Sequence, residues 1–304
     1  MSRIATKVEL SHGLFDRDVR TVVIGVGAQK SGTTWLAAQL ARHVNVHMRE
    51  KEVHYWDVVR SPYIRWDKMA WQGGGGTSPT PRIKKLARSF MRKPKDRGEE
   101  LFGADPVSHV DYANFLSSGR TGQAVVSEVT PAYSLCSAST FAEMIEIHPD
   151  VRFVFLMRDP VDRLWSGVKQ RFRPLLTEDS KLVREGRHAA ALEKAFLRAC
   201  DDVYDPDYRR SRYDETITAL EMAGANAIFM FYETLFTKKS INRLGAFLGL
   251  DGLEARFDQR VYGGLAGEVE LSAIARRTAR ESLAGTYDYV RSRFGAEVPE
   301  QWMT

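Results

Sequence analysis

The chain has 304 residues, of which 43% are hydrophobic and 27% are charged, and its formal net charge at pH 7 is +5. A chain of this length and composition can bury the core of one large α/β domain or of two small ones, as in an ordinary soluble globular protein. The basic balance favours anionic ligands in general terms. The sequence has no run of five Lys or Arg and no interleaved basic and aromatic tract, which argues against a nucleic-acid partner.

Cysteine content and hydropathy indicate the expected compartment. Cys136 and Cys200 fit no metal-ligand spacing and cannot form a disulfide framework. Residues 1–20 lack the apolar segment of a signal peptide, and no window of 18 residues is both apolar and uncharged. We therefore expect a cytoplasmic protein with a polar lead-in over residues 1–20 and no membrane span.

The first predicted elements are a strand, a glycine-rich turn and a helix within residues 22–40. The strand begins with three β-branched residues, and apolar residues recur at helical spacing from Trp35 onward. Between the turn and the helix stand Lys30, Ser31, Gly32, Thr33 and Thr34. In such an arrangement backbone N–H groups and the helix N-terminus surround an anion, while the lysine adds charge and the hydroxyls donate hydrogen bonds. The segment predicts an anion-binding loop.

The next part of the chain is less regular. Residues 46–57 predict a short strand that ends near Met48 and a turn or short helix that begins at Glu52. Residues 60–106 read as an irregular insertion with a glycine run and a basic stretch. The basic stretch is either a lid on the acceptor side or a solvated helix face, and the solvated face is favoured because runs of charge are usually solvated.

From there on helices and strands alternate. Further strands are expected at residues 123–127, 151–157 and 227–231. Helices are expected at residues 106–116, 137–147, 160–171, 190–200, 207–222, 233–248 and 272–293, with loops at 174–190 and 251–269. There is no internal repeat and no clear linker. This alternation predicts a single α/β domain over residues 1–304, with a central parallel sheet flanked by helices.

A second motif follows the strand predicted at 151–157, which is apolar almost throughout and therefore expected to be buried on both faces. Arg158 stands at its carboxyl end, Pro160 suits the first turn of a helix, and that helix carries Ser166 two turns along. A guanidinium and a hydroxyl together suit a phosphate monoester. The pattern is R-x-P-x-x-R-x-x-S, with Arg163 as its second arginine.

Together the two motifs resemble those of sulfotransferases that use 3′-phosphoadenosine 5′-phosphosulfate (PAPS). In a Walker A loop the lysine follows the last glycine, whereas here Lys30 precedes Gly32, the order of that family's 5′-phosphosulfate loop; the second motif resembles its 3′-phosphate signature. The resemblance implies a P-loop-type fold and metal-independent transfer of a sulfuryl group to a hydroxyl or amine, with adenosine 3′,5′-bisphosphate as product. It implies that the cofactor is bound by Lys30, Ser31, Gly32, Thr33, Thr34, Trp35, Arg158, Ser166 and Tyr213.

Within that family the chain is most similar to the heparan-sulfate-type branch. The segment 51–57, KEVHYWD, fits that branch's pattern K-E-x-H-[FY]-[FW]-D at each position. The resemblance implies that Glu52 is the catalytic base, that Lys30 stabilises the leaving oxygen and that His54 also belongs to the catalytic group. It implies an acceptor side lined by Glu52, His54, Asp57 and Tyr133.

The chain departs from that branch in two places. The branch reads E-K-[ST]-P-x-Y where this chain reads EVTPAY over residues 128–133, so Val129 replaces a lysine, and this argues against a polysaccharide acceptor. The K-G-R-type loop that covers the cofactor in the branch has no clean match. The candidates for its role are Arg260, Gly263, Gly264, Arg276 and Arg277.

Two other classes of protein remain as alternatives. A P-loop kinase that uses ATP and magnesium predicts the order GK[ST], which the loop lacks. A non-catalytic nucleotide-binding protein predicts loss of the base or of the lysine, yet Glu52 and Lys30 are both present. For a sulfotransferase, a small-molecule or carbohydrate-derived acceptor is expected, and no residues argue for a particular oligomeric state.

Overall fold

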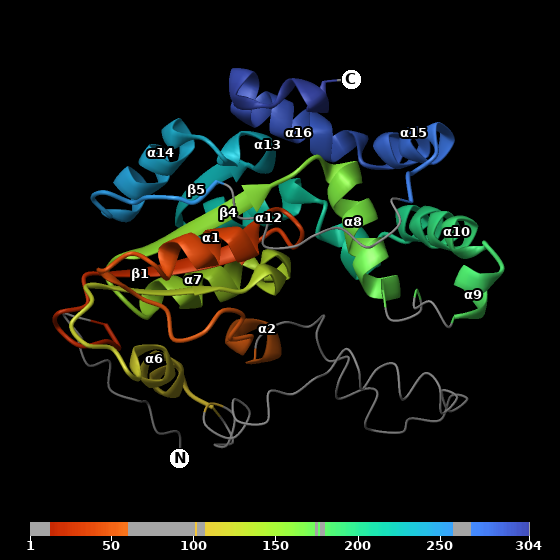
Figure 1. Cartoon of the computed structure of the whole chain (residues 1–304). Coiled ribbons are helices and arrows are strands. Elements are labelled where there is room, and N and C mark those ends of the chain that lie inside the picture. The colour runs from red at the N-terminus through yellow and green to blue at the C-terminus, as the bar shows by residue number, and fades with distance from the viewer. Residues whose placement is uncertain are drawn as a thin grey trace, which may run out of the picture.

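The structure is a computed structural model, and it describes residues 13–59, 101, 107–173, 176, 180–257 and 269–303. At its centre lies a parallel sheet, which has five strands in the part of the chain just given, in the order β2–β3–β1–β4–β5 (Figure 1). The strands are β1 (Thr21–Gly27), β2 (Val46–His47), β3 (Val125–Val129), β4 (Val151–Met157) and β5 (Asn226–Phe231). The strand order reverses at β1, which lies between β3 and β4.

Alternate side chains of the strands enter two separate cores, one on each face of the sheet. Val22 and Ile24 of β1 belong to one core with Phe153 of β4, whereas Val23 belongs to the other core with Val154. All seven residues of β1 are buried, as expected of a strand that is covered on both faces. The apolar runs in the sequence therefore mark strands that receive helices from both sides.

Helices cover both faces of the sheet (Figure 1). One face packs against α1 (Thr33–Leu40), α13 (Tyr232–Leu235) and α14 (Lys238–Leu248). The core on the other face includes residues of α6 (His109–Ser117), α7 (Ala138–Glu146), α8 (Pro160–Phe172), α10 (His188–Asp201), α12 (Tyr213–Met222), α15 (Ala273–Ser282) and α16 (Ala284–Phe294). The shorter helices are α2 (Tyr55–Val59), η1 (Pro131–Leu135), α9 (Lys181–Arg184), α11 (Pro206–Arg209), η3 (Gly295–Glu297) and η4 (Glu300–Trp302).

The predicted fold class is confirmed, and the differences from prediction concern the ends of elements. The helix expected at 233–248 is divided into α13 and α14, because the Thr237 side chain accepts a hydrogen bond from Ser240 N–H and starts a new helix. The helix expected at 272–293 is divided at Leu283 into α15 and α16, and the one expected at 207–222 into α11 and α12. The loop expected at 174–190 contains α9 and the start of α10.

Other helix and strand boundaries differ from the predicted ones by a few residues. Helix α6 begins at His109 rather than at 106, because Ser108 and Asp111 form a capping box. Glu128 and Val129 belong to β3 rather than to the turn that follows it. Most of the predicted insertion at 60–106 and the first twelve residues of the lead-in lie outside the described residues. Within the described part of the chain, no helix is both long enough and apolar enough to cross a bilayer.

Candidate active site

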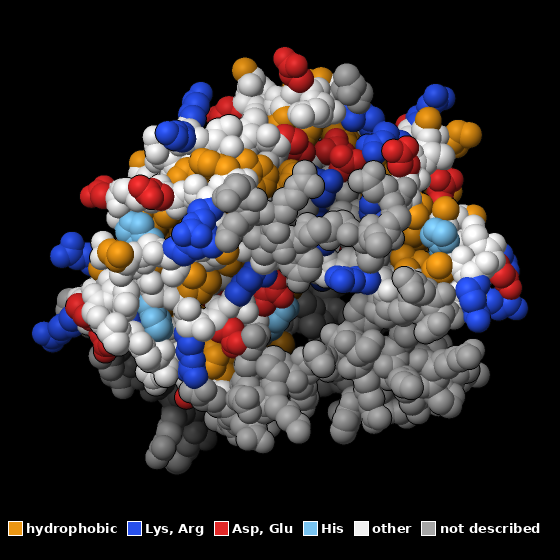
Figure 2. All heavy atoms as spheres, in the orientation of Figure 1, with side chains coloured by type: hydrophobic (Ala, Val, Ile, Leu, Met, Phe, Trp, Pro, Cys, Tyr) orange, Lys and Arg blue, Asp and Glu red, His pale blue; other side chains and the backbone are white. Residues whose placement is uncertain are grey.

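The predicted site residues come from segments that meet at the carboxyl edge of the sheet. The loop after β1 carries Lys30, and Arg158 directly follows β4. The segment after β2 returns to the end of β3, where the Glu52 N–H donates to the Val129 carbonyl (3.1 Å). Ligands of open α/β sheets bind at this edge, next to the strand where the order reverses. Figure 2 shows basic side chains on both sides of acidic and histidine side chains near the middle of the molecule.

The loop between β1 and α1 is folded as an anion-binding turn. Gly32 has a φ of +90° and immediately precedes α1, whose N-terminus has no side-chain cap. A Cβ at Gly32 would lie 3.1 Å from the Tyr232 ring, so a side chain there would be crowded as well as strained by the positive φ. Because the first N–H groups of a helix have no partner within it, they can donate to an anion placed against the turn.

Hydroxyl groups line the same turn. Ser31 is fully buried, and its Oγ makes no hydrogen bond of ordinary geometry with a described residue, although it is near enough to the Tyr213 hydroxyl to affect the pKa of Tyr213. Thr33 is also buried, and Thr34 is half-buried. Because buried hydroxyls almost always have a partner, the Ser31 hydroxyl fits a ligand that accepts a hydrogen bond at this point.

Positive charge gathers around Lys30. Burial lowers the pKa of the Lys30 ammonium, and the charges of four other cationic side chains lower it further. These side chains are Arg158, Arg163, Arg173 and Lys169. Bringing like charges together is unfavourable unless an anion is placed among them. The concentration of charge therefore fits a ligand with several negative charges, and Lys169 and Arg173 are contributors that the sequence motifs did not identify.

Arg158 is held in place through two tyrosines. The Tyr213 hydroxyl donates to the Arg158 carbonyl (2.7 Å) and accepts from the Arg158 N–H (3.3 Å). The Arg158 guanidinium lies over the Tyr232 ring, 5.2 Å from its centroid. Tyr213 is fully buried, so its contact is with the backbone of Arg158. Tyr232 links Arg158 to the loop through its contact with Gly32, and sequence analysis missed it although it directly follows a strand.

Trp35 and Ser166 occupy different environments. Trp35 is buried, its Nε1–H donates to the Arg256 carbonyl (3.0 Å), and its ring contacts those of Phe236 and Phe257. Ser166 is half-buried on α8, two turns from the start of that helix. Helical spacing places Ser166 on the same side of α8 as Lys169, which contributes to the charge around Lys30.

Glu52, His54 and Asp57 form a chain of charged groups. Nδ1 of His54 lies 2.8 Å from the buried Asp57 carboxylate, and Nε2 of His54 lies 3.8 Å from Glu52. Lys51 contacts the other oxygen of Glu52. The Glu52 and His54 side chains remain 41% and 44% exposed, so both can be reached by a molecule from solution.

The charges of this group follow from its contacts. Burial on its own raises the pKa of Glu52, but the interactions with His54 and Lys51 outweigh it and lower that pKa to about 2. Burial on its own lowers the pKa of His54, but the interactions with Asp57 and Glu52 raise it to about 10. At neutral pH Glu52 is therefore an ionised carboxylate beside a protonated imidazole.

The backbone is strained at the three residues predicted to be catalytic. Lys30, Glu52 and His54 have φ values of 73°, 64° and 60°, and they are the non-glycine residues of the described chain with positive φ. A left-handed conformation costs about 1–2 kcal/mol for a residue with a Cβ. Such strain persists only where the surrounding structure holds it, and it is concentrated at functional sites. The conformation thus marks these residues independently of any motif.

Tyr133 and Val129 lie in the interior. Tyr133 is fully buried, and its hydroxyl donates to Glu128 (3.0 Å) and accepts from the Tyr55 N–H (3.0 Å). Its position is beneath the segment that carries Glu52, on the side away from solvent. Val129 is fully buried as well and packs against Gly25, where a Cβ would lie 2.8 Å from the valine side chain. The place of the lysine in the heparan-type pattern is thus filled by an apolar contact between β1 and β3.

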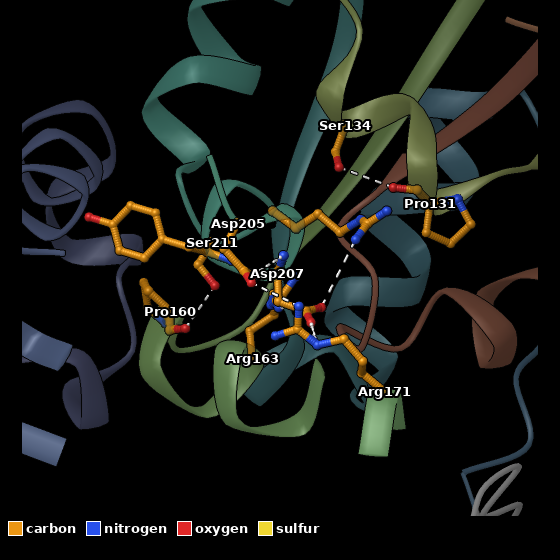
Figure 3. A network of polar contacts seen from close by, with 10 residues as sticks. Pro131, Ser134, Pro160, Arg163, Arg171, Asp205, Asp207 and Ser211 are labelled. Atoms are coloured by element: carbon orange, nitrogen blue, oxygen red, sulfur yellow. Dashed lines mark hydrogen bonds and ion pairs between the residues drawn. The ribbon is translucent and has the colours of Figure 1, made fainter. Parts of the chain in front are cut away.

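A buried network of charges lies beside the site (Figure 3). Arg163, the second arginine of the motif on α8, is fully buried and lies 3.5 Å from Asp207. Arg171 of α8 contacts Asp207 (3.2 Å) and Asp205 (2.8 Å), while Arg210 lies 4.0 Å from Asp207. Arg163 therefore points away from solvent into this network, and Asp207 is a buried group that no sequence motif indicated.

The proposed substitutes for the K-G-R loop are only in part described. Arg276 of α15 forms an ion pair with Asp162 (2.9 Å) and lines a cavity of about 280 Å³ together with Arg158. Arg277 is exposed on the same helix. Arg260, Gly263 and Gly264 lie outside the described residues. Within the described chain, no group of three or more His, Cys, Asp or Glu side chains is arranged to hold a metal ion.

Comparison with known proteins gives the chain its family. A crystal structure of a sulfotransferase from Alicyclobacillus acidocaldarius is similar, with a TM-score of 0.60 and 18% sequence identity over 93% of this chain and 98% of that one, which supports the fold. No curated protein matches the chain. The model of the sulfotransferase family matches residues 23–252, which include the anion-binding loop and the Arg158 motif. A match over this much of the chain shows that it belongs to the sulfotransferase family.

Proposed function

We propose that the protein moves the sulfuryl group of PAPS to a hydroxyl or amine of a small-molecule or carbohydrate-like acceptor. The observation that carries the proposal is that Lys30, Glu52 and His54 each have a left-handed conformation and belong to segments that reach the carboxyl edge of the sheet. When bound, PAPS supplies an activated sulfuryl group with adenosine 3′,5′-bisphosphate as the leaving group. The chain has to bind the bisphosphate, orient the acceptor and take up its proton.

The residues of the loop fit the phosphosulfate end of that molecule. The buried Ser31 hydroxyl and the N–H groups at the uncapped start of α1 are hydrogen-bond donors at adjacent positions of this turn. Lys30 adds positive charge where the leaving oxygen gains negative charge, which is the interaction that favours the transition state over the ground state. Arg158 and Ser166 would hold the 3′-phosphate, away from the reacting atoms, and so orient the cofactor.

Glu52 would accept the acceptor's proton. Its pKa of about 2 keeps it ionised at neutral pH, but it also makes Glu52 a weak base. The proton of a hydroxyl becomes far more acidic once its oxygen begins to bond to sulfur, so proton transfer to Glu52 accompanies the attack instead of preceding it. His54 and Asp57 would keep the Glu52 carboxylate turned towards the acceptor.

The acceptor class follows from two opposing features. The match of residues 51–57 to the heparan-type branch supports a sugar hydroxyl or amine. Val129, which fills the place of that branch's lysine, removes a charge that a polysaccharide-modifying enzyme of this type would have. A small or carbohydrate-derived acceptor satisfies both features.

The cofactor assignment is tested by isothermal titration. Adenosine 3′,5′-bisphosphate is expected to bind the purified protein without magnesium, and Arg158→Ala is expected to weaken it by about 10- to 100-fold, the loss of a charge-assisted hydrogen-bonded contact. ATP with magnesium serves as the comparison ligand, and Arg243→Ala, which alters an exposed pair with Glu297, is the matched control. Preference for ATP with magnesium would instead support a P-loop kinase, and equal bisphosphate affinity in Arg158→Ala would refute the assigned role of Arg158.

A further inference from the structure

A buried carboxylate lies directly beneath the strained segment of the candidate site. Glu128, at the end of β3, is fully buried and accepts hydrogen bonds from the hydroxyls of Tyr112, Tyr133 (3.0 Å) and Thr130 (2.6 Å). These four residues are called the Glu128 cluster below. No ion pair joins Glu128 to a cationic side chain in the part of the chain that the structure describes. Hydroxyl donors therefore take the place of water around its carboxylate.

The Glu128 cluster also holds the backbone of the segment above it. The Tyr55 N–H donates to the Tyr133 hydroxyl (3.0 Å), and the Val53 N–H lies near enough to the Glu128 carboxylate to favour its charged form. The Glu52 N–H donates to the carbonyl of Val129, the residue that follows Glu128 (3.1 Å). Two N–H groups of the segment, those of Glu52 and Tyr55, are thus held by hydrogen bonds to β3 and to the cluster.

This arrangement accounts for the strained backbone. Glu52 and His54, which have left-handed φ values, lie between and beside the two residues whose N–H groups are held, since Glu52 is one of them and His54 directly precedes the other, Tyr55. Relaxation of the segment to an extended conformation would break the hydrogen bond that the Tyr55 N–H donates to the buried Tyr133 hydroxyl. Side chains of the same segment pack onto the cluster too, since the Tyr55 ring stacks on Tyr112 with centroids 4.6 Å apart.

We propose that Glu128 is a positioning residue, which, through its hydrogen bond with Tyr133, keeps Glu52 and His54 turned towards the acceptor. The role rests on the proposed function, because it concerns the orientation of the proposed base. In this proposal the buried Tyr133 supports the segment that carries Glu52 from the interior and does not contact the acceptor.

The choice of carboxylate follows from its partners. Each of the three hydroxyls bonded to the Glu128 side chain donates to it. Gln has nearly the same shape, but its amide NH₂ is a donor, so at least one of these hydroxyls would have to turn and accept instead. Glu128→Gln therefore disturbs the hydrogen bonding while leaving the volume of the site unchanged. Tyr133→Phe removes the link to Tyr55 and leaves Glu128 ionisable.

The readout is the pKa of His54, measured by NMR pH titration of ring-labelled histidines, with His54→Gln used to assign the signal. That pKa depends on how near Glu52 and Asp57 are held. Glu128→Gln and Tyr133→Phe are each expected to lower it from about 10 towards 6.5. Tyr208→Phe is the matched control, because it removes a buried tyrosine hydroxyl bonded to the Ser282 carbonyl (2.8 Å) away from this segment, and it is expected to leave His54 unchanged.

The outcomes separate this proposal from the proposed function. An unchanged His54 pKa in a folded Glu128→Gln protein, or in Tyr133→Phe if Glu128→Gln does not fold, would overturn the positioning role. An equal decrease in Tyr208→Phe would overturn it as well, because the decrease would then reflect general loosening. Binding of adenosine 3′,5′-bisphosphate is measured on the same samples and is expected to be unchanged in all three variants. If the wild-type protein does not bind adenosine 3′,5′-bisphosphate, the result would count against the cofactor assignment and not against the role of Glu128.

Discussion

At the scale of single residues, the candidate site depends on how Glu52 and His54 are charged. Each is held by partners that come from the same short segment, Lys51 and Asp57, and by the other. The sequence alone shows a carboxylic acid, an imidazole and a second carboxylic acid at positions 52, 54 and 57. The contacts determine that Glu52 is ionised and that His54 is protonated at neutral pH, and these charge states lead to two predictions.

The first prediction concerns the proposed base. Glu52→Gln keeps the shape of the side chain but cannot accept the proton, so turnover is expected to fall by about 100-fold or more, in line with the usual contribution of a general base. The measurement is release of adenosine 3′,5′-bisphosphate from PAPS in the presence of a panel of hydroxyl and amine acceptors. Glu297→Gln, an exposed glutamate in a pair with Arg243, is the control. Turnover retained within about threefold by Glu52→Gln would remove Glu52 from the mechanism.

The second prediction concerns the dependence of stability on pH. The pKa of Glu52 is lowered from 4.5 to about 2, so its contribution to stability is present above pH 4.5 and is lost as the pH falls towards 2. The pKa of His54 is raised from 6.5 to about 10, so its contribution is complete below pH 6.5 and is lost as the pH rises through 10. Solvent screens both side chains, which keeps the contributions small.

Thermal unfolding of the wild type and of Glu52→Gln between pH 3 and pH 11 tests this. The difference in Tm between the two proteins is expected to be largest from about pH 4.5 to 6.5 and to shrink on both sides of that window. A difference that does not change with pH would show that Glu52 and His54 are not coupled in the folded protein.

At the scale of elements, helix α8 joins the site to the rest of the molecule. Its N-terminus is capped by Asp159, next to Arg158, and farther along it contributes Arg163 and Arg171 to the network around Asp207. Helices α8 and α11 can approach each other closely because α8 has Gly167 at the contact. A Cβ at this position would lie 2.6 Å from an Asp207 oxygen. The second arginine of the sequence motif thus contacts α11 and not solvent.

Loss of Asp207 is expected to destabilise the protein strongly. Asp207→Asn leaves the fully buried Arg163 without a compensating charge, and this is expected to lower the free energy of unfolding by about 3 kcal/mol. Urea denaturation measures it. Glu297→Gln breaks an exposed ion pair and is expected to cost less than about 1 kcal/mol. Equal losses in the two variants would show that the Asp207 network contributes no more than a surface pair.

At the scale of the whole molecule, the chain follows a doubly wound plan. The sheet separates two cores, its strands are parallel and the strand order reverses at β1, so that the loops after β1, β2 and β4 open at one edge. This plan brings Lys30, Glu52 and Arg158 to the same edge although about 130 residues separate the first from the last. The prediction of a single domain over residues 1–304 stays a prediction, as does any role of residues 60–106.

The sequence by itself determined the family and most of the fold. Apolar runs buried on both faces, the glycine turn before Lys30 and the proline after Arg158 are local features, and each acts through the conformational preferences of a few neighbouring residues. They were enough to predict a parallel α/β sheet and to name candidate site residues, but not Lys169, Arg173 or Tyr232. The errors were at the ends of helices, where a cap such as Thr237 competes with continued helical periodicity.

The tertiary structure decided what those residues do to one another. It turned Tyr133 inward onto Glu128, buried Arg163 against Asp207, and placed Glu52 and His54 in left-handed conformations. It also determined that Glu52 has a pKa of about 2 and His54 one of about 10. Burial, strain and charge depend on contacts between segments that are far apart in the chain, so no local pattern contains them.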